Sequence, residues 1–266
     1  MTFLKIGTFA AVGIYALILL FFFVFQRAFV FRQGTRLITP RVNETYAARP
    51  VTIETADGLF LRALYKAPEN GKPTVIYFHG NTGIVEDAMH KTKKLAEAGY
   101  GVLLPEYRGY GGNTGKPTEK GLTKDAEAAL AFVKAQGADK VVYYGMSMGT
   151  GVANALAENH PPAAMVQECG FTSMADAGQN RYPFLPVGML MKDKFDSEKR
   201  MKKLTAPVLF LHGEKDATVP VGQMRRNRQA VASADVAVRL YPDGHHVDLH
   251  EFGAADDVLK WLEERF

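Results

Sequence analysis

The sequence predicts an α/β domain, with a mostly parallel sheet covered by helices on both faces, behind a separate apolar helix at the N-terminus. Three observations lead to this prediction. Between residues 51 and 266, short apolar runs typical of buried strands alternate with longer segments of helical periodicity. Residues 6–25 contain no charged side chain. A chain of 266 residues is long enough for one such domain with a large core.

The apolar N-terminal segment has the length of a membrane span. Its twenty residues, at about 1.5 Å each, match a hydrocarbon core of about 30 Å. A cleaved signal peptide would be shorter and end at a small-residue cleavage site, and a buried core helix would have a polar face. We therefore expect a transmembrane anchor in residues 1–30 and a juxtamembrane linker in residues 31–50, followed by the folded domain in residues 51–266.

Charge predicts the orientation of this anchor. Lys5 and the amino terminus precede the span, and four arginines follow it before any acidic residue: Arg27, Arg32, Arg36 and Arg41. The positive-inside tendency then places the domain on the cytoplasmic side of a single-pass anchor. A net charge of +4 suits a domain beside anionic lipid. The basic residues are dispersed and accompany no recognition motif, so we expect no nucleic acid partner; the oligomeric state stays open.

The first half of the domain begins with a hairpin, because residues 51–54 and 59–64 are strand-like and flank the turn Ala-Asp-Gly. A strand in residues 73–78, a helix in 87–98 and a strand in 102–104 follow. The next helix has an apolar stripe formed by Leu122, Ala126, Ala129, Leu130 and Val133. Later, Ala255, Val258, Trp261 and Leu262 give the final helix one buried face, and Trp261 is expected in the core.

The most informative motif is Gly-Met-Ser-Met-Gly in residues 145–149, between the apolar run 141–144 and the helix-prone run 152–158. In this strand, turn and helix context, G-x-S-x-G forms a nucleophile elbow. The flanking glycines allow the strand and helix to approach closely, and the serine occupies a strained turn. Ser147 is therefore the predicted nucleophile, with the partial positive charge of a helix N-terminus beneath it.

A serine nucleophile needs a general base and a carboxylate that orients the base. The buried strand in residues 207–211 runs into His-Gly-Glu-Lys-Asp, and Asp216 is the predicted acid. The alternative role for Asp216 is to cap the turn before Val219. Glu168, at the end of the apolar strand 164–166, is the rival acid.

The predicted base lies in the turn after the strand in residues 236–241, which contains three histidines. We prefer His246 over His245, because Gly-x-His is the spacing that commonly presents the base in this kind of fold. His250 lies near the start of the last helix and is expected to be a helix-entry residue. These three histidines and Asp248 could also bind a metal, but no second cluster completes a tetrahedral site. We therefore expect neither a metal nor a cofactor.

An oxyanion hole needs two backbone N–H groups, one after the nucleophile and one from an earlier loop. Met148 supplies the first. Asn81, in the His-Gly-Asn-Thr-Gly loop after the strand in residues 73–78, supplies the second. His79 is expected to brace that loop by hydrogen bonding. Cys169 is the only cysteine, which excludes an internal disulfide, and it is expected to be a small buried residue.

Taken together, these motifs resemble the membrane-anchored α/β-hydrolase-domain family, related to the serine aminopeptidase type. The resemblance is carried by residues 79–83, 107–111, 145–149, 171–173, 212–216 and 244–248, and by the N-terminal anchor. It implies a triad of Ser147, Asp216 and His246, and hydrolysis of esters, thioesters or peptides. One departure is Glu106, where many relatives have aspartate; we expect a structural role there.

The periodic pattern is interrupted in residues 171–206, which we interpret as a cap-like insertion. It is either an apolar lid over the site or a segment packed on the sheet edge. The sequence thus predicts a membrane-anchored serine hydrolase that forms an acyl-enzyme from a small acyl ester or thioester. The alternatives are an aminopeptidase-like enzyme acting on short peptides and a catalytically silent hydrolase fold that serves as an interaction module at the lipid bilayer.

Overall fold

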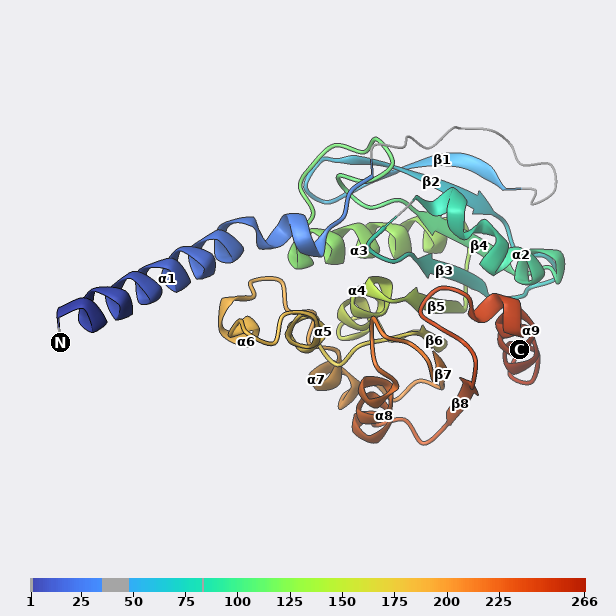
Figure 1. Ribbon diagram of the computed structural model, residues 1–266. Coiled ribbons are helices and arrows are strands. Elements are labelled where there is room, and N and C mark those ends of the chain that lie inside the picture. Colours follow the sequence, from blue (N-terminus) through green and yellow to red (C-terminus); the bar gives the residue numbers. More distant parts are fainter. Residues whose placement is uncertain (1, 35–47, 83) are drawn as a thin grey trace.

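The computed structural model describes residues 2–34, 48–82 and 84–266, and its centre is an eight-stranded sheet (Figure 1). The strand order is β1-β2-β4-β3-β5-β6-β7-β8. β2 pairs antiparallel with both β1 and β4, and the other neighbours are parallel. This confirms the predicted mostly parallel sheet and its hairpin. The strands are β1 (Arg49–Glu54), β2 (Phe60–Lys66), β3 (Thr74–Phe78), β4 (Gly101–Pro105), β5 (Val141–Met146), β6 (Ala164–Glu168), β7 (Val208–Gly213) and β8 (Val236–Tyr241).

Helices cover both faces of this sheet, as predicted (Figure 1). Leu122, Val152 and Met224 pack in one hydrophobic core, and Leu95 and Trp261 pack in a second. The first core lies under α3 (Glu119–Ala135), α4 (Met148–Ala157) and α8 (Val221–Ala230). The second lies under α2 (Met89–Glu97) and α9 (Ala254–Glu263), with the short helices η1 (Val85–Ala88) and η2 (Leu249–Phe252) nearby.

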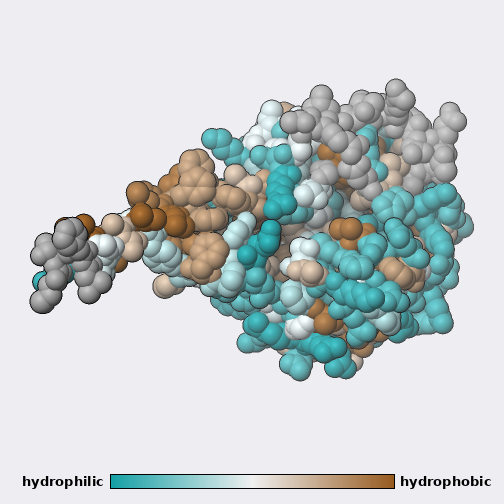
Figure 2. All heavy atoms as spheres, in the orientation of Figure 1, coloured by the Kyte–Doolittle hydropathy of each residue, from teal (hydrophilic) through white to brown (hydrophobic). Residues whose placement is uncertain are grey.

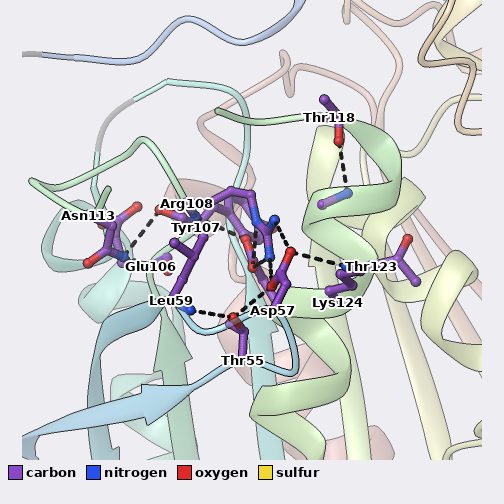
Figure 3. Close-up of polar contacts among 12 residues, drawn as sticks. Thr55, Asp57, Leu59, Glu106, Tyr107, Arg108, Asn113, Thr118, Thr123 and Lys124 are labelled. Atoms are coloured by element: carbon purple, nitrogen blue, oxygen red, sulfur yellow. Dashed lines mark hydrogen bonds and ion pairs between the residues drawn. The ribbon is translucent and has the colours of Figure 1, made fainter. Parts of the chain in front are cut away.

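A charged cluster ties the β1–β2 turn to the loop after β4 (Figure 3). Arg108 donates to Asp57 at 2.9 Å and, through Nε, to Asp125 of α3 at 2.8 Å. Thr55 and Lys124 also donate to Asp57, at 2.8 and 3.1 Å. Hydrogen bonds from Arg108 hold the pKa of Asp57 well below its usual range. The cluster fixes the antiparallel end of the sheet to α3.

The N-terminal helix α1 (Thr2–Val30) projects from the folded body as a largely apolar rod (Figures 1 and 2). Its segment Lys5–Val30 is long and apolar enough to cross a membrane. At its other end, Val30 and the following Phe31 are buried in the first core. The helix therefore joins the domain directly. Most of the predicted linker 31–50, with Arg36 and Arg41, lies outside the described residues.

The insertion between β6 and β7 has two parts with different packing. α7 (Ser197–Met201) packs against α4 and α8 on the sheet. α5 (Met174–Arg181) and α6 (Val187–Leu190) pack against each other beside α1 (Figure 1). We call residues 174–191 the cap. The two parts of the insertion thus pack against different elements, and the lid stays a prediction.

Candidate active site

Ser147 lies in the turn between β5 and α4, with the strained backbone angles φ +51° and ψ −118°. Such a conformation costs a residue other than glycine on the order of 1–3 kcal/mol. The backbone N–H of Ser147 is held by the carbonyl oxygen of Glu168, at 2.9 Å. A Cβ atom on Gly149 would lie 1.9 Å from the carbonyl oxygen of Phe78, so only glycine fits there. The geometry of the turn is that of a nucleophile elbow.

The structure brings the three predicted triad residues into one hydrogen-bonded chain. Ser147 Oγ lies 2.8 Å from His246 Nε2, and His246 Nδ1 lies 2.8 Å from Asp216 Oδ2. A neutral imidazole that donates from Nδ1 to the carboxylate accepts the serine hydroxyl proton at Nε2. The arrangement can therefore activate a serine nucleophile.

Asp216 is buried and is held in the anionic form. The backbone N–H groups of Thr218 and Val219 both donate to its Oδ1 at 2.8 Å. Burial alone would raise the pKa of Asp216, but hydrogen bonds from His212 and His246 outweigh that effect and hold the pKa well below its usual range. His212, which lies 3.4 Å from Asp216 Oδ2 and donates to the Val219 carbonyl at 2.8 Å, was not predicted as part of the site.

The other two histidines of the β8 turn are occupied elsewhere. His245 is 59% exposed at its side chain, and both its backbone N–H and its Nδ1 contact Asp248, at 2.6 and 3.0 Å. The side chain of His250 is largely buried, and its Nε2 lies 3.2 Å from the carboxylate of Glu168. The acid and base loops approach very closely, because a Cβ atom on Gly213 would lie 2.3 Å from the carbonyl oxygen of Gly244. This contact fixes the position of the base relative to its acid.

Glu168, the rival acid, belongs to a separate buried network beneath the triad. Its carboxylate pairs with Lys91 and accepts hydrogen bonds from Tyr144 at 2.6 Å and from His250. Burial raises the pKa of Glu168, but the charge of Lys91 and the hydrogen bond from His250 outweigh it, so the net pKa is well below its usual range. The structure thus places Asp216, not Glu168, against His246. Lys91 was not singled out from the sequence.

Three potential metal ligands, Cys169, Asp216 and His246, have atoms within 4.8 Å of one another in the described part of the chain. Burial and the nearby charges of Glu168 and Asp216 raise the pKa of the Cys169 thiol well above its usual value. A thiol kept protonated is a poor metal ligand. The described geometry therefore fits a hydrogen-bonded triad better than a metal site.

The His-Gly-Asn loop is braced from below, as expected for His79. The His79 ring stacks on Tyr107 at 4.1 Å between centroids, and its Nε2 lies 2.9 Å from the buried carboxylate of Glu106. Tyr107 donates to the carbonyl oxygen of His79 at 3.0 Å, and Tyr110 donates to that of Asn81 at 3.4 Å. The contacts of Glu106 are those of a structural residue.

A cavity of about 580 Å³ opens over the triad, within the range of pockets that bury a small ligand. Ser147, His246, Asn81 and Met148 line its floor, so both predicted oxyanion residues lie at the cavity. Most of its walls come from α1, from the residues that follow it and from the cap. These residues include Phe22, Gln26, Phe29, Val30, Arg32, Arg181, Tyr182, Leu185, Val187, Leu190 and Met191.

Residues 61–254 of the chain match the dienelactone hydrolase family. The chain belongs to this family. An uncharacterized Mycobacterium tuberculosis protein is 38% identical over 205 residues, which cover 75% of this chain and 73% of the relative. The lysophosphatidylserine lipase ABHD12 of Rattus norvegicus is 34% identical over 170 residues, which cover 56% of this chain and 42% of that protein.

The structure of the hydrolase is similar to that of the Pyrococcus furiosus esterase Pf2001, with a TM-score of 0.73 and 20% identity over 88% of this chain and 99% of that one. These similarities confirm the α/β-hydrolase fold and the resemblance to α/β-hydrolase-domain proteins. The hydrolase is an enzyme of the serine esterase type.

Proposed function

We propose that the hydrolase is anchored in a membrane and cleaves carboxylic ester or thioester substrates through an acyl-enzyme. The observation that carries this proposal is the hydrogen-bonded chain of Ser147, His246 and Asp216 at the floor of a largely apolar cavity. Family membership supports hydrolysis, and the intact polar chain argues against a catalytically silent module.

In the proposed mechanism, His246 Nε2 takes the proton of Ser147 as Oγ attacks the carbonyl carbon of the substrate. The backbone N–H groups of Asn81 and Met148 bind the oxyanion that develops. Asp216 stabilises the imidazolium, which then protonates the departing alcohol or thiol. Water attacks the acyl-enzyme with His246 as base, and the acid and free serine are released.

The anchor is α1, in the proposed division into anchor (residues 1–30), linker (31–50) and hydrolase domain (51–266). The uncharged stretch and exposed apolar surface of the helix support a membrane span. Arg27 and Arg32 follow the span, so the hydrolase domain is proposed to face the cytoplasm.

The cavity favours an acyl group over a peptide N-terminus. Among the described residues that line it, the charged side chains are arginines, Arg32 and Arg181, and none is Asp or Glu. An aminopeptidase needs a group that pairs with the substrate ammonium, which these walls do not offer. The apolar walls instead stabilise a buried acyl chain by about 0.8 kcal/mol per methylene. The lipase and esterase relatives agree with this choice.

Labelling with a fluorophosphonate probe in membranes tests the proposal. The wild-type protein should react and should hydrolyse medium-chain p-nitrophenyl esters faster than acetate, with aminoacyl amides much slower. Asp243 is an exposed carboxylate in the turn after β8, outside the triad, so the variant Asp243→Asn should label as the wild-type protein does. A protein that fails to label would support the silent module, and a preference for aminoacyl amides would support the peptidase.

A further inference from the structure

We propose that the acyl chain of the substrate enters from the bilayer between α1 and the cap, and that α1 forms one wall of the acyl-chain site. The inference rests on the proposed function and adds to it, because it assigns the anchor a role in substrate selection. It also narrows the substrate to a single-chain acyl ester carried by the membrane, since the cavity of about 580 Å³ has the size of a pocket for one small ligand.

The cap lies along the apolar length of α1. Near the middle of the helix, Tyr15 donates to the carbonyl oxygen of Phe184 at 2.9 Å. Near its end, Gln26 donates to the carbonyl oxygen of Leu190 at 3.1 Å and accepts from the backbone N–H of Lys192 at 2.7 Å. Tyr15 and Gln26 are about 16 Å apart along the helix axis. A bilayer that surrounds α1 therefore also reaches the cap.

One face of α1 belongs to the cavity and another faces outward. The Phe22 ring packs against Tyr182 of the cap at 5.3 Å and against Phe29 at 5.2 Å, and all three side chains line the cavity. Phe22 and Phe29 are two turns apart and share a face. Phe21 and Phe25 do not line the cavity and are 51% and 52% exposed. The second pair suits contact with lipid.

The tip of the cap exposes large apolar side chains next to this helix. Phe184 and Met189 are 59% and 83% exposed. Exposed apolar groups beside a membrane helix are typical of a surface that inserts among lipids. Charged groups gather near the end of α1, where Arg27 pairs with Asp193 at 2.8 Å. This pair marks the level of the lipid head groups, and the cap tip lies on its apolar side.

The wall formed by α1 is fixed to the catalytic floor. The side chain of Asn81 donates to the carbonyl oxygen of Val30, the last residue of α1, at 3.2 Å. Phe31 follows in the core and packs against Phe195. The distance between the chain site and Ser147 is thus set by direct contacts, and an acyl chain that lies against Phe22 and Phe29 leads to the nucleophile.

The proposal that α1 forms a wall of the acyl-chain site is tested with full-length protein reconstituted in ether-linked phosphatidylcholine vesicles. The substrates are 4-methylumbelliferyl palmitate in the vesicle and the soluble butyrate. Phe22→Ala should lower the palmitate-to-butyrate ratio of kcat/KM about tenfold, since a buried aromatic contact with the chain is lost. Phe25→Ala removes the same side chain one turn away and should leave the ratio unchanged. Equal ratios in the two variants would overturn the proposal.

The entrance is tested by attaching a nitrobenzoxadiazole label to M189C in the same vesicles, with E97C as control. Cys169 is buried, so it does not compete for the label. Glu97 is exposed on α2, far from α1 (Figure 1). Doxyl-labelled lipid should quench the label at residue 189 and not the label at 97. Equal quenching at both positions would mean that the cap lies outside the bilayer.

The two proposals fail in different ways. Wild-type protein that hydrolyses neither ester would reject the proposed function. Suppose instead that the wild-type protein hydrolyses butyrate. If Phe22→Ala then leaves the palmitate-to-butyrate ratio of kcat/KM unchanged, or if doxyl-labelled lipid does not quench the label at residue 189, only the entrance through the bilayer is rejected.

Discussion

The floor and the walls of the active-site cavity are built in different ways. The floor consists of loops at the ends of parallel strands, where added atoms collide with the backbone, as at Gly149 and Gly213, and where short hydrogen bonds fix every triad side chain. The walls consist of α1 and the cap, which meet through aromatic rings and a few hydrogen bonds. The floor sets the chemistry, and the walls contain side chains that can be exchanged without moving it.

The largest expected effect comes from removing the nucleophile in the floor. Ser147→Ala should abolish probe labelling and reduce ester turnover to the background rate, because it removes the hydroxyl that is hydrogen-bonded to His246 Nε2. The protein should stay folded, since a small side chain replaces a small one. Turnover above the uncatalysed rate, measured with p-nitrophenyl butyrate, would remove Ser147 from the mechanism.

The next effect separates two neighbouring histidines. His246→Ala should lower kcat by on the order of 10³-fold or more, as loss of a triad member does. His245→Ala is the matched control and should change kcat far less, because His245 is turned toward Asp248. Steady-state kinetics of both variants decides the assignment, and the opposite ranking would transfer the role of base to His245.

A stability effect is expected beneath the floor, at Glu168. The folded-state pKa of this group lies below its unfolded value of about 4.3, so its stabilisation is present above that pH and is lost as the pH falls toward the folded pKa. Glu168→Gln should lower the free energy of unfolding at pH 7 by about 3 kcal/mol, since Lys91 is left buried and unpaired. The same substitution should also make the free energy of unfolding depend less steeply on pH between pH 5 and pH 3.

Urea unfolding in detergent at several pH values measures both quantities. Glu54 is an exposed carboxylate, so Glu54→Gln serves as the control and should change neither the free energy of unfolding nor its dependence on pH by much. If Glu168→Gln behaves in the same way as this control, the buried network does not stabilise the fold.

The smallest expected effect concerns the walls. Leu190 lines the cavity, so Leu190→Ala should lower the gain in kcat/KM between butyrate and octanoate esters by about fourfold. Phe184 does not line the cavity and is exposed, so Phe184→Ala should leave this chain-length profile unchanged. If both substitutions reduce the gain in kcat/KM with chain length, the effect comes from a change in the whole cap and not from the contact of Leu190 with the acyl chain.

The contrast between floor and walls also explains what the sequence could predict. Strand-end motifs are local, so a strand, a glycine turn and one nearby polar residue point to Ser147, Asp216 and His246, whose side chains form one hydrogen-bonded chain in the structure. The pairing of Lys91 with Glu168 joins residues 77 positions apart, and no local pattern indicates it. The cavity-facing side of α1 could not be predicted for another reason. A helix that is apolar on all sides has no periodicity that distinguishes an outward-facing Phe25 from a cavity-facing Phe22.

The positive φ angle of Ser147 has a consequence for the evolution of this family. Glycine adopts that backbone conformation without strain, so Ser147→Gly should yield an inactive protein that melts at a higher temperature than the active one. Selection for hydrolysis therefore acts against selection for thermal stability at this one codon. In a lineage that no longer uses its substrate, selection for stability would favour glycine there, and the motif would read Gly-Met-Gly-Met-Gly.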